Sequence, residues 1–197
     1  MTPYDAAGRL IGSKDPLGGR TAYAYDALGN LSRVSENGNG AEYFYDPAGN
    51  LIGMKDAEGR AAAFEYDAAG NLVKTRYPDG TSAINEYDVL GRLIRAVPRH
   101  GVPIAYRYDA AGRVIEIAEG ERVTRYAYDL AGNLTSVTAP DGSRTAYRYD
   151  AANNPVRVID ALGSETSYRY DSMGRLTEAT QPNGGTASLA YDLAGKL

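Results

Sequence analysis

The sequence lacks cysteine and tryptophan and has a single histidine and two phenylalanines among its 197 residues. Without cysteine, disulfide bonds and thiolate metal sites are excluded. With His100 as the one imidazole, zinc and iron centres have too few ligands, so we expect no metal and no cofactor. Basic clusters are also missing, and the net charge is −4. A phosphate-tracking surface needs such clusters, so we expect neither nucleic acid nor an anionic membrane as a partner.

Long hydrophobic runs are absent as well. No apolar stretch approaches the ~18–20 residues of a transmembrane helix, so we expect no membrane span. Residues 1–5 lack the basic start and apolar run of a signal peptide.

Tyrosine, in contrast, is abundant, with 17 copies that follow a rule. The pair Tyr-Asp occurs ten times, at intervals of 20 or 21 residues. Two small or apolar residues and a glycine follow each pair, then Arg, Asn or Lys, and then Leu or Val; one repeat departs from this at the glycine and the leucine. The repeat motif comprises Tyr4, Asp5, Gly8, Tyr25, Asp26, Gly29, Tyr45, Asp46, Gly49, Tyr66, Asp67, Gly70, Tyr87, Asp88, Gly91, Tyr108, Asp109, Gly112, Tyr128, Asp129, Gly132, Tyr149, Asp150, Tyr170, Asp171, Gly174, Tyr191, Asp192 and Gly195.

A second turn signal lies about ten residues after each Tyr-Asp pair, as in Pro78-Asp79-Gly80. Aspartate followed by glycine three residues later favours a type I turn, in which the carboxylate accepts a backbone N–H and glycine takes positive φ. The segments between turns are rich in Tyr, Val, Ile and Thr, which favour strands. Two turns per ~21 residues therefore predict one antiparallel β-hairpin per repeat.

Alternation assigns the two faces of each hairpin. Tyr147 and Tyr149 share one face, and Arg148 takes the other. In the strand after the glycine, alternation places Ile94 and Ala96 on one face and Arg95 on the other. We expect an all-β fold of tandem hairpins with one apolar-aromatic and one polar face, forming a long curved sheet, an open spiral or a partial shell.

The pattern Y-x-Y-D-x-x-G-[R/N]-L, followed by P-D-G or D-x-x-G, resembles the Rhs/YD-repeat family and covers essentially the whole chain. The resemblance implies a β-strip that spirals into a hollow shell. Bacterial Rhs proteins and toxin-complex subunits enclose a C-terminal toxin in such shells, and teneurins use similar shells at the cell surface. It also implies a secreted or cell-surface location, with adjoining repeats and an enclosed toxin polypeptide as partners.

Residues 1–197 are interpreted as a single array of ten Tyr-Asp motifs and nine full repeats, an excerpt of a longer shell. Asp15-Pro16-Leu17-Gly18 is similar to the D-P-x-G-L segment at which Rhs shells end and cleave themselves. Gly19 replaces its leucine, and the segment sits at an ordinary second-turn position, so we interpret it as a repeat turn.

Catalytic constellations are not found. His100 lies in the turn Pro98-Arg99-His100-Gly101, and a nucleophile site would need an adjacent base. Ten of the 25 acidic residues belong to Tyr-Asp pairs, so no carboxylate pair is singled out for glycosidase chemistry. Asn37-Gly38-Asn39-Gly40 matches neither a calcium loop nor a phosphate loop and is interpreted as a long turn. We expect a structural protein and no enzyme.

Three hypotheses remain for the function. The first is a non-catalytic shell segment that encloses a toxin, with the tyrosine face inside. The second is a surface adhesion or carbohydrate-binding module that uses exposed tyrosines. The third is edge-to-edge self-association of unpaired end strands into filaments.

Two places break the repeat. Asn153-Asn154-Pro155 replaces Gly-[R/N/K]-Leu, and Asn85 stands where most repeats have an aromatic two residues before the motif tyrosine. We expect an altered turn and local loosening at the first, and local loosening at the second.

Overall fold

A computed structural model describes residues 3–192 and 195–197. It divides into two compact units, Met1–Pro103 and Ile104–Leu197, each of which is described by itself. Eighteen strands and no helix occur in the part of the chain that the structure describes. The predicted all-β fold of tandem hairpins is therefore confirmed.

Each unit contains nine strands. The first unit holds β1 (Gly12–Lys14), β2 (Arg20–Tyr25), β3 (Leu31–Glu36), β4 (Asn39–Tyr45), β5 (Leu51–Lys55), β6 (Ala61–Tyr66), β7 (Leu72–Arg76), β8 (Ser82–Tyr87) and β9 (Leu93–Val97). The second unit holds β10 (Ile104–Tyr108), β11 (Val114–Glu119), β12 (Arg122–Tyr128), β13 (Leu134–Thr138), β14 (Arg144–Tyr149), β15 (Pro155–Ile159), β16 (Glu165–Tyr170), β17 (Leu176–Thr180) and β18 (Thr186–Ser188).

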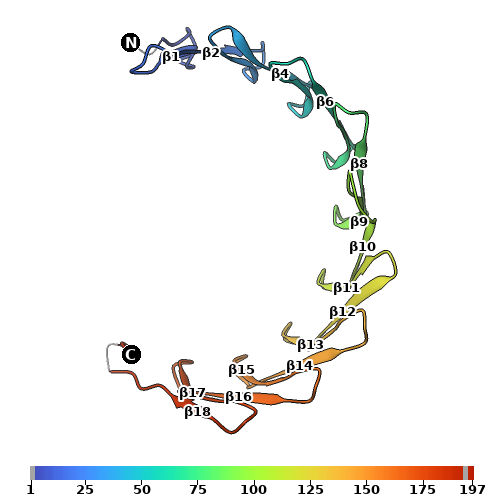
Figure 1. Cartoon of the computed structure of the whole chain (residues 1–197), viewed down its shortest axis with the longest axis vertical. Helices are drawn as coiled ribbons and strands as arrows, with labels where there is room; N and C mark the ends of the chain where they lie inside the picture. Colours follow the sequence, from blue (N-terminus) through green and yellow to red (C-terminus); the bar gives the residue numbers. More distant parts are fainter. Residues whose placement is uncertain (1–2, 193–194) are drawn as a thin grey trace. The chain divides into compact units, whose positions relative to one another are not determined.

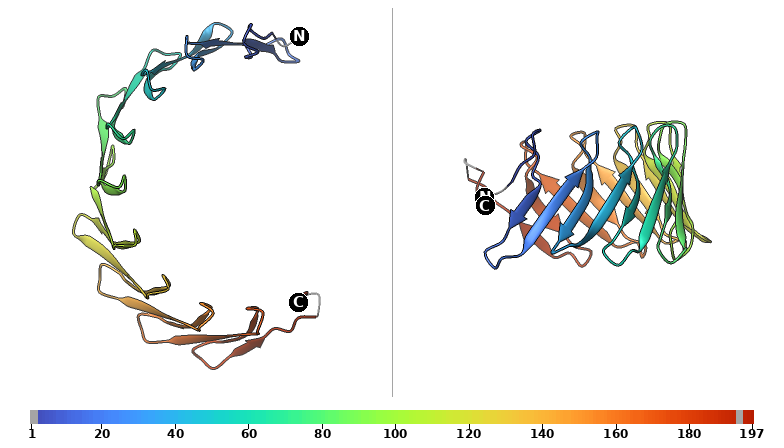
Figure 2. Two further views of the ribbon diagram at one scale, coloured as in Figure 1. Left: turned by 180° about the vertical axis from the view of Figure 1, so that it is seen from behind. Right: turned by 90° about the horizontal axis from the view of Figure 1, so that it is seen from above.

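Within each unit every strand pairs antiparallel with the next one along the chain, for example β2 with β3 and β14 with β15 (Figure 1). Within each unit the turns therefore alternate between the two edges of a single-layered strip (Figure 2). In each unit the fully described turns that begin at a Tyr-Asp pair lie at one edge, which we call the Tyr-Asp edge. The second turns lie at the other, which we call the opposite edge.

The Tyr-Asp turns have the predicted backbone geometry. In the turn at Asp26, the N–H of Gly29 donates to the Asp26 carbonyl over 3.1 Å, and the Asp26 N–H donates to the Asn30 carbonyl over 2.9 Å. Gly29 has φ +93°, the left-handed conformation that avoids strain only without a Cβ. This is a type I turn followed by a residue that closes a bulged three-residue hairpin loop.

The segment at Asp15 is also an ordinary repeat turn, as predicted. The Gly18 N–H donates to the Asp15 carbonyl over 3.2 Å, and the Asp15 carboxylate accepts from the N–H groups of Leu17 and Gly19. The prediction of a long turn at residues 37–40 is wrong. β3 and β4 are joined by Asn37 and Gly38 alone, both at positive φ, because a two-residue hairpin turn of this kind matches the twist of its strands.

A β-bulge after each Tyr-Asp turn that joins two named strands corrects the predicted faces. Glu86 pairs with Arg95 and Tyr87 pairs with Leu93, so the register skips Ile94. Strict alternation therefore fails there, and it is Leu93 that shares the tyrosine face with Ala96.

Between β4 and β5 the register skips Ile52 in the same way, so the Ile52 side chain lies on the polar face. Ile52 lines one hollow there together with Arg33, Glu42 and Phe44. Ile115, at the corresponding bulge of the second unit, likewise lies beside Arg107 and Arg125. A bulge adds one residue to one strand of a pair. Strict alternation of faces along the sequence therefore assigns the residues beyond the bulge to the wrong face.

No hydrophobic side chain is fully buried in the described residues, and Ser136 is the one buried polar residue. A single layer has no second layer to pack on, so each strand gains its contacts from its two neighbours. The fold is therefore held together by strand pairing and by the contacts that link one repeat to the next.

Candidate functional site: the Tyr-Asp turn and its link to the next repeat

The aspartate of each Tyr-Asp pair uses both carboxylate oxygens. At Asp109, Oδ1 accepts the backbone N–H groups of Ala111 and Arg113 over 2.9 and 3.0 Å. Oδ2 accepts Nε of Arg113 over 2.7 Å. The predicted capping by the carboxylate is confirmed, because its oxygen satisfies N–H groups that the turn leaves free.

The residue after the turn glycine completes this arrangement. Where it is asparagine, as at Asn71, its Nδ2 takes the place of the arginine Nε and donates to Oδ2 of Asp67 over 2.9 Å. Sequence reasoning assigned no role to this position. The signal was present, since the position holds only Arg, Asn or Lys, and each of these side chains is a hydrogen-bond donor.

The hydrogen bonds lower the pKa of these carboxyl groups. For Asp109 the backbone N–H of Arg113 is the main cause, followed by the Arg113 guanidinium. For Asp67 the side chain of Asn71 comes first and its backbone N–H second. Donors to the charged form favour ionisation, so the carboxylate is held in the state that the turn requires.

The motif tyrosine reaches back across one repeat. The hydroxyl of Tyr149 donates to the carbonyl oxygen of Leu134 over 3.0 Å. β13 and β14 are joined by a turn only at the opposite edge, so this bond closes the pair at the Tyr-Asp edge, where no turn holds it. The same bond joins Tyr25 to Leu10, Tyr45 to Leu31, Tyr66 to Leu51, Tyr87 to Leu72, Tyr128 to Val114, Tyr170 to Pro155 and Tyr191 to Leu176.

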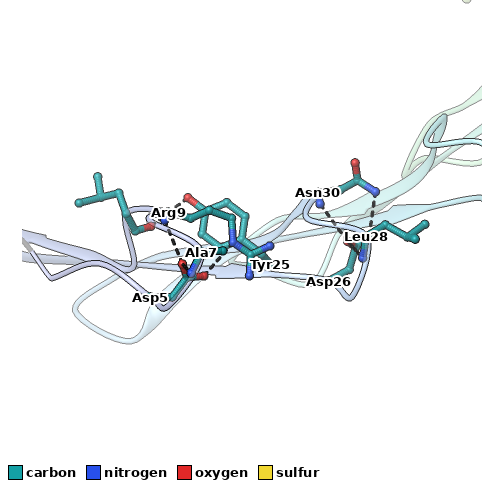
Figure 3. Close-up of polar contacts among 8 residues, drawn as sticks. Asp5, Ala7, Arg9, Tyr25, Asp26, Leu28 and Asn30 are labelled. Atoms are coloured by element: carbon teal, nitrogen blue, oxygen red, sulfur yellow. Dashed lines mark hydrogen bonds and ion pairs between the residues drawn. The ribbon is translucent and has the colours of Figure 1, made fainter.

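Arginine adds a second link where it follows the glycine. The Arg9 guanidinium lies over the ring of Tyr25, 4.6 Å from its centroid, while its Nε holds Asp5 (Figure 3). Arg113 lies over Tyr128 at 4.7 Å in the same way. One arginine thus contacts the carboxylate of its own turn and the tyrosine of the next, which is a favourable cation–π geometry.

The earlier tyrosine of Tyr-x-Tyr has a different environment. Tyr147 pairs with Val158, which pairs in turn with Thr166. Tyr126 likewise pairs with Val137, which pairs in turn with Thr145. These rings lie across apolar and small side chains of neighbouring strands, which is cross-strand packing.

The face of the strip that lies opposite the tyrosines carries charged side chains. Arg95 and Glu86 face each other across β8 and β9 with 2.6 Å between Nη1 and Oε1. Further pairs that face each other are Arg33–Glu42, Arg107–Glu116, Arg125–Glu116 and Arg169–Glu178. Arg76–Glu65 and Arg157–Glu165 are diagonal pairs, offset by two residues. Exposed pairs add little stability, but opposite charges placed across strands favour one register over its neighbours.

The two irregular places retain the repeat geometry. Asn153 takes φ +65° in place of glycine, its N–H donates to the Asp150 carbonyl over 3.1 Å, and Pro155 pairs with Tyr149. The predicted altered turn is therefore wrong, because asparagine tolerates the left-handed conformation. The Oδ1 of Asn153 also accepts Nδ2 of Asn133 over 2.7 Å, which adds a link to the preceding repeat.

Asn85 also makes a contact of its own. Its Nδ2 donates to the Leu72 carbonyl over 3.2 Å, the same oxygen that accepts the Tyr87 hydroxyl. Loosening at Asn85 and at residues 153–155 stays a prediction.

Residues 3–192 and 195–197 hold no cluster of metal-binding side chains. No three of His, Cys, Asp and Glu are placed to hold a metal ion there. His100 is exposed in its turn. No helix in this part of the chain is long and apolar enough to cross a membrane.

The repeat geometry has counterparts in known proteins. The family model described as the teneurin YD-shell matches residues 2–117 and 102–195. The chain belongs to the YD-shell family. Among curated proteins no sequence matches it.

Three solved structures show the YD-shell fold of this chain. A crystal structure of TcdB2-TccC3 without its hypervariable C-terminal region superposes with a TM-score of 0.70 at 18% identity, covering 99% of this chain and 12% of that one. A Tc holotoxin pore from Photorhabdus luminescens gives 0.58 at 16% identity, covering 99% and 14%. TcdB2-TccC3-TEV gives 0.56 at 16% identity, covering 98% and 14%. The chain thus spans about an eighth of the length of these relatives.

Proposed function

We propose that this YD-shell chain is a segment of the wall of a shell that encloses a toxin polypeptide, and that it acts as a scaffold without catalysing a reaction. The similar structures are of TcdB2 with TccC3 and of a Tc holotoxin pore. By the same analogy, we propose that the protein is secreted or displayed at the cell surface.

The bond from each motif tyrosine to the preceding repeat carries this proposal. It recurs in both units and makes each hairpin continue the one before it. A wall needs such continuity, because a gap between strands would expose unpaired N–H and C=O groups and admit water or protease. An active site is a single arrangement of side chains that occurs once in a chain, whereas these tyrosine contacts recur in each repeat.

The test begins with the reading frame beyond residue 197 and the expression of its full product. The proposal expects further repeats, and after them a C-terminal domain unrelated to the repeats. In the purified full-length protein, trypsin should leave that domain intact for much longer than it leaves the same domain expressed alone.

A pair of variants in the full-length protein ties this protection to the wall. Tyr128→Ala combined with Tyr149→Ala and Tyr170→Ala removes three consecutive links between repeats and should expose the enclosed domain to trypsin. Arg148→Ala, on the charged face next to Tyr149, leaves the links in place and should preserve protection. A domain that is digested equally fast in the wild-type protein and in isolation would overturn the encapsulation proposal.

A further inference from the structure

Asparagine followed directly by glycine occurs three times in the chain, and the three pairs lie in different settings. The backbone nitrogen of such a glycine can attack the asparagine side-chain amide, because glycine has no Cβ to block the approach. Asn37-Gly38 forms the two-residue turn between β3 and β4, Asn39-Gly40 begins β4, and Asn183-Gly184 lies in the turn between β17 and β18. The state of each glycine N–H therefore decides how readily each pair reacts.

The N–H of Gly38 makes no hydrogen bond in the part of the chain that the structure describes. The N–H of Gly184, in contrast, donates to the Gln181 carbonyl over 2.9 Å and closes its turn. The glycine of the Asp-Gly pair at Gly80 is engaged in the same way by the Tyr77 carbonyl. In the two-residue turn the ladder bonds of the flanking strands close the hairpin, so the Gly38 nitrogen is left available.

Gly38 is also open to its surroundings. No heavy atom lies within 4 Å of the position that a Cβ would take at Gly38, and Asn37 is exposed. At Gly40 the same position would lie 2.0 Å from the Val34 carbonyl oxygen, because β3 crowds the backbone there. The turn therefore gives the reacting groups and water room that the strand denies.

The Asn37 side chain has a hydrogen-bond donor on its oxygen. The backbone N–H of Arg20 donates to Asn37 Oδ1 over 3.4 Å. Attack on Cγ moves negative charge onto Oδ1, and a donor at that atom stabilises the charge. The Gly185 N–H holds Oδ1 of Asn183 over 2.9 Å, so the two turn asparagines differ in the glycine nitrogen and not in this donor.

We propose that Asn37 is a self-modification site in the first unit, at which the chain loses ammonia without an enzyme. The Gly38 nitrogen gives up its proton and bonds to Cγ of Asn37, while the Cγ–Nδ2 bond breaks and the side-chain nitrogen leaves as ammonia. The product is a succinimide ring. Water then opens the ring at the side-chain carbonyl, which gives aspartate, or at the main-chain carbonyl, which gives isoaspartate. The net change is the gain of water and the loss of ammonia.

The isoaspartate product does not fit this turn. It routes the main chain through Cβ and Cγ and so adds a carbon between residues 37 and 38. The turn has no slack for this, because Glu36 pairs directly with Asn39. The Asn37 N–H also donates to the Arg20 carbonyl over 3.0 Å, so the disturbance reaches β2. The aspartate product retains the turn, since aspartate tolerates the left-handed φ of +50° found at Asn37.

The experiment follows the three Asn-Gly pairs of the 197-residue chain during incubation at mildly alkaline pH. Peptide mapping by mass spectrometry detects each conversion by its mass change, and fragmentation separates aspartate from isoaspartate. Asn37 should convert roughly threefold to tenfold faster than Asn183, because opening one backbone hydrogen bond costs about that factor. Asn39, which is held in the ladder of β4, should also be slower than Asn37. In concentrated urea the three rates should converge, since the fold sets their order.

Two variants complete the test. Asn37→Gly removes the reacting side chain, is compatible with positive φ and should abolish conversion at this turn. Asn183→Asp installs the residue present at Asp79 and Asp141 in equivalent turns, and it should leave the Asn37 rate unchanged. Conversion of Asn183 as fast as that of Asn37 in the folded chain overturns the proposal, and so does the same order of rates in folded and unfolded protein.

Hydrogen exchange measures the structural consequence. After conversion to isoaspartate, β3 and β4 should exchange faster than in fresh protein. Asn37→Asp carries the other product from the start and should retain the protection of both strands. Unchanged protection in protein that contains isoaspartate would contradict the predicted opening of the turn. Protection of an enclosed domain from trypsin is a separate measurement, so the encapsulation proposal can stand or fall independently.

Discussion

The aspartate of the Tyr-Asp pair acts at the scale of one turn. Its Oδ1 binds two backbone N–H groups and its Oδ2 binds the side chain that follows the glycine, as Asp171 does with Met173 and Arg175. Aspartate is suited to this position because its short side chain places a carboxylate within reach of its own turn. The recurrence of this geometry explains why the aspartate is present in all ten motifs.

Removing one such carboxylate should weaken the fold locally. For Asp109→Ala we expect a lower urea midpoint than for Asp109→Asn, and a lower midpoint for Asp109→Asn than for the wild-type protein. Asparagine retains an oxygen for the N–H groups of Ala111 and Arg113 but loses the charge that attracts the guanidinium. Equal midpoints for the three proteins would contradict the capping role.

The same carboxylates should make the protein acid-sensitive. Hydrogen bonds hold the pKa values of Asp46, Asp109 and Asp150 below the ordinary 3.8, so the folded chain binds protons less tightly than the unfolded chain. Their contribution is full above pH 3.8 and is lost as the pH falls through the lower folded-state values. We expect the urea midpoint to fall as the pH is lowered below 3.8, and a flat profile there would contradict this.

The hairpin is the scale at which tyrosine matters. In each strand pair whose turn lies at the opposite edge, the tyrosine hydroxyl closes the end that has no turn, as Tyr128 does with the Val114 carbonyl. Repeats of this kind are joined by nearest-neighbour contacts, so each tyrosine bond stabilises the junction between its own repeat and the preceding one.

Removing one hydroxyl isolates this link. Tyr149→Phe deletes the donor to the Leu134 carbonyl and retains the ring, and we expect a loss of about 0.5–1.5 kcal/mol in the free energy of unfolding. Tyr147→Phe is the matched control, because the Tyr147 hydroxyl makes no hydrogen bond within the described residues and should change little. Urea denaturation of both variants makes the comparison, and equal losses would contradict the link.

The whole molecule lacks a buried apolar core in its described residues. Contacts within each unit run between strands that follow each other in the sequence. Stability should therefore be distributed along the strip, and damage should remain near its origin.

Hydrogen exchange can test this local behaviour in the second unit. For Tyr149→Ala we expect faster exchange in β13 to β16, while β10 and β11 retain their protection. Uniform loss of protection across β10 to β18 would instead show a single cooperative unit.

The period, the two turns per repeat, the all-β hairpins and the capping role of Asp109 and its equivalents could be predicted from the residue pattern. Each turn and its cap depend on residues only a few positions apart, and the regular recurrence of these turns reveals the period. Three features could not be predicted in this way: the bulge that carries Ile52 to the charged face, the bond from Tyr149 to Leu134 and the stacking of Arg9 on Tyr25. The two contacts join neighbouring repeats about 15 residues apart, and the bulge depends on how two strands align, so neither is encoded in one short segment.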